Sequence, residues 1–445
     1  MPRPRKRLGA EELLAMLEWL GLTLVGLTIV GSCILVLVAV WMAYTLRTHF
    51  SLRHEALALE TRLLAHPLPL DDRLPHVVVQ IPVFNEGAVV GRAIASCSAL
   101  DWPRDKLHIQ ICDDSTDETT GLAKDAMASA SATGINIAIC HRDNRSDFKA
   151  GALHAAMAAT SFEYFAILDV DYVPAPDFLR RCMAVLIAEP TLAFVQARPD
   201  YLNPRASMFT RAQAIILDYH YGIEQTTRSW SGPAVPFNGT CGIWRRAAIE
   251  AGGGWRGDTL TEDWDLTYRA LLNGWRGQFL STVTVPGELP TSLTAWFTQQ
   301  KRWATGVGQV AWRTLPALVR NRRVSGTSRW GAMLPLVAWL GYLTFSATIL
   351  LALTAMMLQP STALTLGLIV YATVVALAVA LFALMLAANR FLRPRTAITS
   401  FIVDFPAALA LAAYISWANL RSLPGTLTGR PREFVRTPKQ GSTAT

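Results

Sequence analysis

The sequence predicts an α/β domain with a mostly parallel sheet, inserted between α-helical transmembrane segments, and three observations support this fold class. Hydrophobic residues make up 51% of the 445 residues, and the mean hydropathy of +0.28 exceeds that of an ordinary soluble domain. Long uncharged runs lie near both ends of the chain. Between them, strand-like and helix-like segments alternate over a length sufficient for one large core.

The first apolar run covers residues 20–46 and is long enough to span a bilayer. Its length, with no small-residue cleavage site following it cleanly, favours an uncleaved anchor over a signal peptide. The flanking charges conflict about orientation. Basic residues 3–7 favour an inside N-terminus, whereas Arg47, Arg53 and Arg62 favour the opposite arrangement.

The alternating region begins near Pro75. Apolar, often β-branched runs predict buried strands over residues 76–82, 107–112, 135–140, 164–168 and 192–196. The segments between them predict helices over residues 88–99, 118–131, 149–160 and 177–189. Such alternation predicts a parallel sheet with helices on both faces, and ligands collect at the carboxyl ends of its strands.

Apolar and basic residues mix beyond Gly306, which predicts an amphipathic helix at the membrane interface. Two spanning segments follow. A third, residues 398–420, contains Asp404 and Pro406, so it either spans or lies at the interface. We therefore expect five parts: N-terminus, anchor and linker (1–74), α/β domain (75–305), interfacial helix (306–330), membrane helices (331–421), and C-terminal loop and tail (422–445).

The formal charge of +8 concentrates beside the apolar segments, which predicts positive-inside topology and contact with anionic lipid. No basic stripe interleaves with aromatic residues in the α/β domain, so we expect no nucleic-acid partner. The six cysteines lack C-x-x-C spacing. They predict free thiols in a reducing compartment, without a zinc site or a disulfide framework.

Acidic clusters follow two of the predicted strands. Asp169 and Asp171 come directly after a buried strand, where they could hold a divalent metal such as Mg²⁺ together with substrate phosphates. The alternative is a solvated pair in a loop. Asp113 and Asp114 end another strand, and adjacent like charges require a compensating cation or donor. We expect this pair to face a nucleotide, while Ser115 or Asp117 caps the next helix.

Two further positions on the same side of the predicted sheet suit a nucleotide. Phe84 could contact a base and Glu86 could hydrogen-bond its edge or the ribose, although a plain β–α turn explains both residues equally well. Lys149 opens a predicted helix, where free backbone N–H groups favour an anion. A phosphate contact is one interpretation of Lys149, and a surface lysine is the other.

Two later motifs suggest transfer chemistry. Thr261, Glu262 and Asp263 begin a predicted helix, either as a variant capping box or with Asp263 as a general base on an acceptor hydroxyl. Arg302 offers a fork for phosphate oxygens, and Trp303 offers an apolar plane for a sugar. Trp303 could instead anchor the chain at a membrane interface.

These motifs together closely resemble the cellulose-synthase-like processive glycosyltransferases of family 2, of the mannan and glucan synthase type. The resemblance covers about residues 75–308 and includes F-N-G-T-x-G-x-W-R (237–245), T-E-D (261–263) and Q-x-x-R-W (299–303). It implies a GT-A-type fold and the following roles: Asp263 as base; Phe84, Glu86, Asp113, Asp114, Lys149, Asp169, Gln299 and Arg302 on the nucleotide sugar; Asp169 and Asp171 on Mg²⁺ or Mn²⁺; Phe237, Asn238, Gly239, Thr240, Glu262 and Trp303 on the acceptor.

The tail resembles the F-x-V-T-x-K gating loop of cellulose synthases, which closes over bound nucleotide. Phe434, Thr437 and Lys439 match the pattern, whereas Arg436 stands where the family has Val. Nothing of domain length follows Lys439, so regulation by a cyclic dinucleotide bound to this chain is not expected.

The resemblance implies a membrane-embedded inverting glycosyltransferase that polymerises a β-linked glucan or mannan and secretes the chain across the membrane. The expected partners are UDP-glucose or GDP-mannose, the growing polysaccharide and membrane lipid. One alternative is transfer of a single sugar to a lipid or glycolipid, and another is a non-catalytic scaffold or transporter. We expect a bacterial inner or plasma membrane, with the catalytic domain in the cytosol because nucleotide sugars are found there.

Overall fold

The computed structural model describes residues 10–132, 134–232, 234–321, 326–428, 439 and 441. Its α/β domain is built on one seven-stranded sheet with the order β3-β2-β1-β4-β6-β5-β7. The strands are β1 (Val77–Val83), β2 (Leu107–Asp113), β3 (Asn136–His141), β4 (Tyr164–Ile167), β5 (Leu192–Tyr201), β6 (Gly242–Arg245) and β7 (Arg276–Gly287). All neighbouring strands pair in parallel except that β6 runs antiparallel to both β4 and β5.

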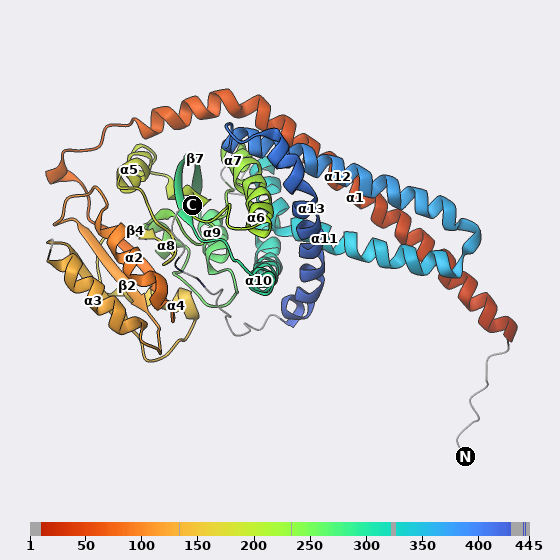
Figure 1. Ribbon diagram of the computed structural model, residues 1–445, viewed down its shortest axis with the longest axis horizontal. Coiled ribbons are helices and arrows are strands. Elements are labelled where there is room, and N and C mark those ends of the chain that lie inside the picture. Colours follow the sequence, from red (N-terminus) through yellow and green to blue (C-terminus); the bar gives the residue numbers. More distant parts are fainter. Residues whose placement is uncertain are drawn as a thin grey trace, which may run out of the picture.

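Helices cover both faces of this sheet (Figure 1). The helices of the domain are α2 (Gly87–Ser98), α3 (Thr119–Ser131), α4 (Phe148–Ala158), α5 (Phe178–Ala188), α6 (Met208–Tyr219), the π-helix η2 (His220–Gln225), α7 (Thr226–Ser231), α8 (Arg246–Ala251) and α9 (Glu262–Leu272). Alternate residues of β1 explain the two layers. Val79 packs with α2, α3 and α5, whereas the neighbouring Val78 packs with α4, α8 and α9. A strand buried on both faces is therefore mostly apolar, and Gln80 is the polar exception in β1.

The five predicted strands and four predicted helices of the first half are confirmed, with bounds that differ by a few residues. The register aligns the ends of β1 and β2, because Val83 pairs with Asp113. The segments that follow β1, β2 and β4 therefore meet at one edge of the sheet. This edge carries Glu86, Asp114 and Asp169.

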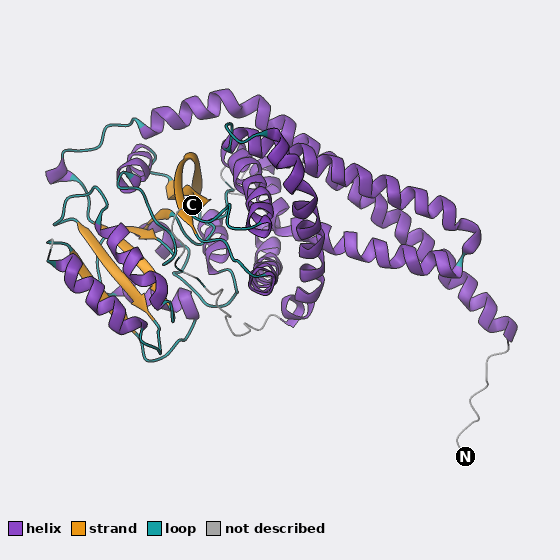
Figure 2. Ribbon diagram, in the orientation of Figure 1, coloured by secondary structure: helices purple, strands orange, loops and turns teal. Residues whose placement is uncertain are grey.

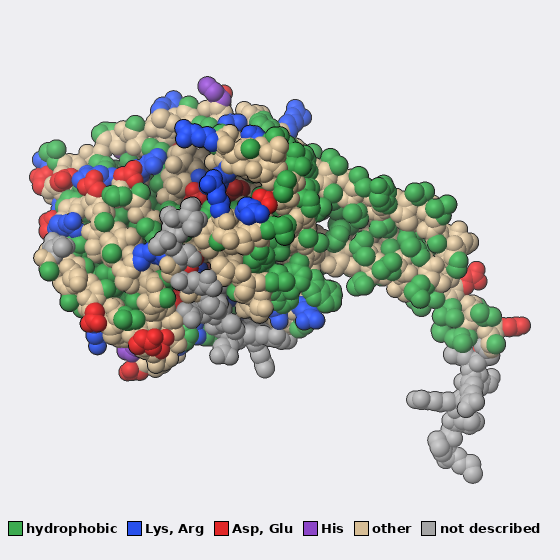
Figure 3. Space-filling model, in the orientation of Figure 1, with side chains coloured by type: hydrophobic (Ala, Val, Ile, Leu, Met, Phe, Trp, Pro, Cys, Tyr) green, Lys and Arg blue, Asp and Glu red, His purple; other side chains and the backbone are tan. Residues whose placement is uncertain are grey.

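Among the described residues, four helices are long and apolar enough to cross a membrane. These are α1 (Ala10–Leu64), α11 (Gly326–Leu358, of which 340–358 qualifies), α12 (Ala363–Leu392) and α13 (Ile398–Thr428, of which 398–426 qualifies). Helices α1, α11 and α12 lie side by side and extend away from the domain (Figures 1 and 2). Hydrophobic side chains cover the visible face of this bundle, and charged side chains gather over the domain (Figure 3).

Helix α13, the segment of uncertain role in the sequence, runs across the base of the bundle (Figure 1). It packs against α6 and α10, and its Asp404 accepts hydrogen bonds from Arg211 of α6 at 2.9 and 3.0 Å. A carboxylate inside an apolar helix is costly unless it is paired. The arginine thus explains how this segment accommodates Asp404.

Helix α10 (Leu293–Arg320) contains the Q-x-x-R-W motif and the first part, 306–320, of the predicted interfacial helix. The expected division at residues 305 and 306 consequently falls inside one continuous helix. Short 3₁₀ turns complete the described structure: η1 (Asp71–Arg73) precedes β1, and η3 (Pro360–Thr362) joins α11 to α12.

Candidate active site

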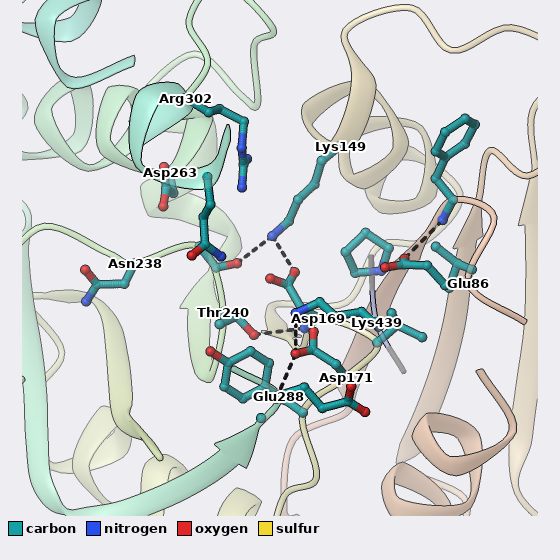
Figure 4. Close-up of a pocket in the computed structure, with 18 of the residues that line it drawn as sticks. Glu86, Lys149, Asp169, Asp171, Asn238, Thr240, Asp263, Glu288, Arg302 and Lys439 are labelled. Carbon is teal, nitrogen blue, oxygen red and sulfur yellow. Dashed lines mark hydrogen bonds and ion pairs between the residues drawn. The ribbon is translucent and has the colours of Figure 1, made fainter. Parts of the chain in front are cut away.

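A polar cavity opens at the carboxyl ends of β1, β2 and β4, where the sequence predicts a ligand site. Figure 4 shows cationic and acidic side chains from separate elements converging on its centre. The predicted site residues that line it are Phe84, Glu86, Asp114, Lys149, Asp169, Asp171, Asn238, Gly239, Thr240, Glu262, Asp263, Gln299, Arg302, Trp303 and Lys439.

Asp169 and Asp171, the two acids of the D-x-D sequence that follows β4, are held in place from several sides. The backbone N–H of Asp169 donates to Thr240 Oγ1 at 2.8 Å. Asp171 is 2% exposed, and its Oδ2 accepts from the backbone N–H of Glu288 at 3.0 Å and from Lys439 Nζ at 2.5 Å. The loop is therefore fixed before any ligand arrives.

Lys149 links three of the predicted motifs. Its Nζ donates to Asp169 Oδ1 at 2.6 Å and to the carbonyl of Gly239 at 2.8 Å, and it lies 4.0 Å from Glu262 Oε1. Burial acts to lower the pKa of Lys149, but the charges of Asp169 and Glu262 outweigh it and raise the pKa. Lys149 is therefore a cation in the centre of the site rather than a surface lysine.

Asp263 lies in the first turn of α9. Burial first, and then the charge of Glu262, raise its pKa to about 7, while Lys149 and Arg302 act in the opposite direction. A carboxyl group with a pKa near neutrality is ionised in part at pH 7 and still binds a proton readily. This is the property required of a general base that works near neutral pH.

Gly239 brings the F-N-G-T segment directly against Asp263. Its φ of +78° lies in the left-handed region, and a Cβ at this position would come to 3.0 Å from Asp263 Oδ2. A side chain here would combine backbone strain with crowding of the carboxylate. Glycine at this position therefore keeps the space beside Asp263 open.

Gln299, Arg302 and Trp303 reach the cavity from α10. Burial lowers the pKa of Arg302, although Glu262, Asp169 and Asp263 act to raise it. In Figure 4, the side chains of Arg302 and Lys149 lie on the same side of Asp169. One helix thus provides a cation and an aromatic plane to the site.

The wall of the cavity at Phe84 contains an arginine that sequence reasoning missed. The guanidinium of Arg145 lies 3.4 Å from the ring centre of Phe84, and both residues line the cavity. Asp114 also lines it and accepts from Arg142 at 2.7 and 2.6 Å in a two-point pair. Neither arginine lies in a recognisable motif, and only their position after a predicted strand hinted at a role.

Two predicted site residues do not line the cavity. The carboxylate of Asp113 is fully buried and accepts from Thr120 Oγ1 at 2.6 Å and from His141 Nδ1 at 2.8 Å. Burial acts to raise its pKa, but these hydrogen bonds and those from Ser115 lower it. Phe237 is fully buried in the core, where its ring packs against Trp244. In this structure neither side chain therefore reaches the cavity, where the other predicted site residues meet.

The N-terminus of α9 also differs from one expectation. Thr261 stands at the N-cap but makes no side-chain capping bond, and among the described residues its Oγ1 has no hydrogen-bond partner. Before α3, the N-cap is Glu118, which makes no side-chain capping bond, and the predicted cap Asp117 instead accepts from the backbone N–H of Thr119 at 3.0 Å. The acids of T-E-D therefore lie at the cavity without a capping box.

Of the predicted gating residues, Lys439 contacts Asp171, whereas Phe434 and Thr437 lie outside the described residues. Glu288 is not among the predicted site residues. Its carboxylate pairs with Arg92 at 2.7 Å and lines the cavity beside Asp171. The carbonyl of Asp171 accepts from the same arginine at 3.3 Å, so α2 braces the D-x-D loop.

The donor set fits a divalent metal of the Mg²⁺ or Mn²⁺ type. Among the described residues no cluster of three or more His, Cys, Asp or Glu forms a complete metal site. Asp169 and Asp171 offer two carboxylates at the cavity, and such ions bind through a few carboxylates together with water and substrate phosphates. Lysine ammonium groups now neutralise both acids.

A family model described as "Glycosyltransferase like family 2" matches residues 75–306. A glucomannan 4-β-mannosyltransferase of Arabidopsis thaliana is 42% identical over 254 residues, which cover 56% of this chain and 48% of that protein. A probable glucomannan 4-β-mannosyltransferase of the same plant is 40% identical over 259 residues, covering 57% and 58%. The chain thus spans about half the length of the curated relatives it matches. These plant relatives give no support to the expected bacterial membrane.

Among solved structures, the mannosyltransferase PcManGT from Pyrobaculum calidifontis, in complex with GDP-Man and Mn²⁺, has a similar fold. The TM-score is 0.57 at 18% identity, and the match covers 92% of this chain and 99% of that one. The likeness shows a GT-A-like fold with a mostly parallel sheet. The family match, which covers half of the chain, and the motifs collected around the cavity lead to one conclusion: this chain belongs to the family 2 glycosyltransferases.

Proposed function

We propose that the protein is an inverting glycosyltransferase that extends a β-linked polysaccharide of the mannan or glucomannan type from a nucleotide sugar. The observation that carries this proposal is the position of Asp263, which shares one cavity with Asp169 and Asp171 and has Lys149 between them. The names of the relatives favour mannose as the transferred sugar and GDP-mannose as its donor.

In this proposal the acceptor hydroxyl oxygen attacks the anomeric carbon of the donor sugar. The new C–O bond forms as the bond from that carbon to the diphosphate breaks, so the configuration inverts. Asp263 accepts the proton of the hydroxyl, and the nucleoside diphosphate leaves as an anion. A divalent metal bound by Asp169 and Asp171 would neutralise charge on that leaving group.

The other residues bind and orient the reactants. Lys149 and Arg302 place positive charge beside the departing diphosphate. Phe84 and Arg145 form the wall at which the nucleoside would lie, with Asp114 beside them. Trp303 offers its plane to the acceptor sugar.

The arrangement of the helices supports a topology for the proposal. If α1, α11 and α12 cross the membrane, η3 and the start of α1 lie on the face opposite the catalytic domain (Figure 1). Arg47, Arg53 and Arg62 then lie on the catalytic side, together with Lys439. We propose that this side is cytosolic, and that α10 and α13 lie along the membrane surface.

A donor screen on the purified protein in lipid nanodiscs tests the function. GDP-mannose and UDP-glucose are supplied separately with short β-mannan and β-glucan acceptors, and products are sized by mass spectrometry and analysed for linkage. We expect a ladder of β-linked products from GDP-mannose. A single sugar added to a lipid would contradict the polymerase, and no transfer from either donor would contradict the transferase.

A further inference from the structure

The π-helix η2 lies next to the F-N-G-T segment and has no role in the mechanism above. It joins α6 to α7 without a break, so His220–Gln225 form an interruption inside a longer helix. π-turns are rare in helices and are frequent at functional sites. η2 also packs on the membrane bundle, where Ile223 shares a hydrophobic cluster with Leu384 and Ala388 of α12.

A series of hydrogen bonds leads from η2 toward the cavity. Its last bond, to the carbonyl of Thr240, fixes the orientation of the side-chain amides of Gln196 and Asn238. Gln196 Nε2 donates to the carbonyl of Thr240 at 2.7 Å, so Gln196 Oε1 must face Asn238. This oxygen accepts from Asn238 Nδ2 at 2.9 Å and from the Asn238 backbone N–H at 3.3 Å. The remaining amide atom, Asn238 Oδ1, therefore faces His220 Nε2 at 3.4 Å.

The other ring nitrogen of His220 faces an acid. His220 Nδ1 lies 2.9 Å from Glu224 Oε2, and the second carboxylate oxygen accepts from Tyr219 OH at 3.0 Å. Arg228 lies 3.9 Å from the same carboxylate. Burial acts to raise the pKa of Glu224, but the hydrogen bond from His220 and the charge of Arg228 lower it to about 2. Glu224 is therefore ionised and can only accept.

Both neighbours of the His220 ring are thus acceptors, namely a carboxylate oxygen and an amide oxygen whose orientation is fixed. An imidazole that donates from both nitrogens carries a positive charge. The cation is compensated by Glu224, with Tyr219 and Arg228 as the other polar groups on this carboxylate.

These hydrogen bonds end at the segment from Asn238 to Thr240, which lies against the residues of the proposed chemistry. Thr240 Oγ1 accepts from the N–H of Asp169, and the carbonyl of Gly239 accepts from Lys149. Gly239 also lies directly against Asp263. A shift of Asn238 would therefore alter the spacing between the base, the lysine and the D-x-D loop.

We propose that His220 is a positioning residue, which as a cation paired with Glu224 holds Asn238 and, through Gln196, fixes the segment from Asn238 to Thr240 against Asp263 and Lys149. His220 does not touch the reacting atoms in this proposal. Because η2 rests on α12, the placement of the F-N-G-T segment depends on the membrane bundle as well as on the sheet.

A kinetic test measures kcat and the donor KM of the full chain in nanodiscs, and it rests on the proposed function. The variants are His220→Gln, the isosteric Glu224→Gln, Asn238→Ala and the double variant of His220→Gln with Asn238→Ala. The exposed His154→Gln is the matched control. We expect His220→Gln and Glu224→Gln to lower kcat about tenfold while the donor KM changes less than about twofold. Since His220 acts through Asn238, the double variant should be no slower than Asn238→Ala alone.

Hydrogen–deuterium exchange provides a reading that needs no activity. Peptides containing Asn238–Thr240 should exchange faster in His220→Gln and Glu224→Gln than in the parent protein or in His154→Gln. Unchanged exchange in this segment, or losses of kcat that multiply in the double variant, would overturn the proposal. If the parent protein transfers no sugar, the proposed function fails, and the exchange measurement still decides the role of His220.

Discussion

Asp263 is placed so that its charge state, rather than its position alone, controls the proposed reaction. Its pKa of about 7 results from burial and from the adjacent Glu262. The carboxylate form is the base, so activity should rise as the pH increases through about 7 and should fall as the pH decreases below it. A pH profile of kcat/KM for the donor measures this dependence. A profile that is flat between about pH 6 and 8 would contradict Asp263 as the titrating base.

Gly239 offers a second test at the residue scale. Gly239→Ala forces alanine into a left-handed conformation and places its Cβ 3.0 Å from Asp263 Oδ2, so we expect kcat to fall by at least about tenfold. Gly121→Ala is the matched control, because a Cβ at this position in α3 meets no atom within 4 Å. Steady-state kinetics of both variants measures the effect, and equal rates would show that the space beside Asp263 is not required.

At the scale of elements, Glu60 connects the membrane anchor to the sheet. It lies near the end of α1, is 2% exposed, and accepts from the backbone N–H and hydroxyl groups of both Ser281 and Thr282 in β7. Glu60→Ala leaves these donors without their carboxylate, which should destabilise the fold by about 2–3 kcal/mol. Denaturation of the protein in detergent measures this change, with the exposed Glu55→Ala as control. A loss no larger than that of the control would contradict the anchoring role.

The sequence predicted the elements whose signals are local. The runs of β1, β2 and β4 are buried on both faces of the sheet, so most of their residues are apolar and the strands are easily recognised. Strand β6 has only four residues and lies inside the F-N-G-T-x-G-x-W-R motif, which hides it. The π-turn of η2 has no sequence pattern that distinguishes it from an α-helix.

The sequence likewise predicted those site residues that belong to a local motif, and it missed those that only the fold brings to the cavity. The motifs indicated the carboxylates of Asp169, Asp171 and Asp263 because these acids occur together with the other motifs, although an acid in a loop or at a helix start also has a structural explanation when it stands alone. An aromatic residue in a motif is ambiguous, and Phe237 belongs to the core. Arg145 lies outside every motif, and only the folded chain places it over Phe84.

At the scale of the whole molecule, the predicted site residues come from separate parts of the chain and meet in one cavity. The D-x-D loop follows β4, Asp263 lies in the first turn of α9, and the Arg–Trp pair lies on α10 beside the membrane helices. In the proposed function, a growing sugar chain at Trp303 would leave close to the bundle. A metal and the donor diphosphate would then displace the two lysines that pair with Asp169 and Asp171.

Removal of the metal tests this requirement. Treatment with EDTA should abolish transfer and weaken nucleotide-sugar binding, and added Mn²⁺ should restore both, because the diphosphate then regains its counter-charge. Calorimetry of donor binding with and without Mn²⁺ measures the effect. In Asp171→Asn, Mn²⁺ should no longer strengthen binding, and full transfer in EDTA would contradict the metal site.

The most direct test of the central claim is the Asp263→Asn variant, assayed for both transfer and donor binding. The amide keeps the shape of the side chain but cannot accept the proton, so kcat should fall by about 10²- to 10⁴-fold while donor affinity is retained. The surface variant Asp258→Asn, which removes only the contact with Arg313, should keep full activity. Sugar transfer by Asp263→Asn at the parent rate would contradict the account.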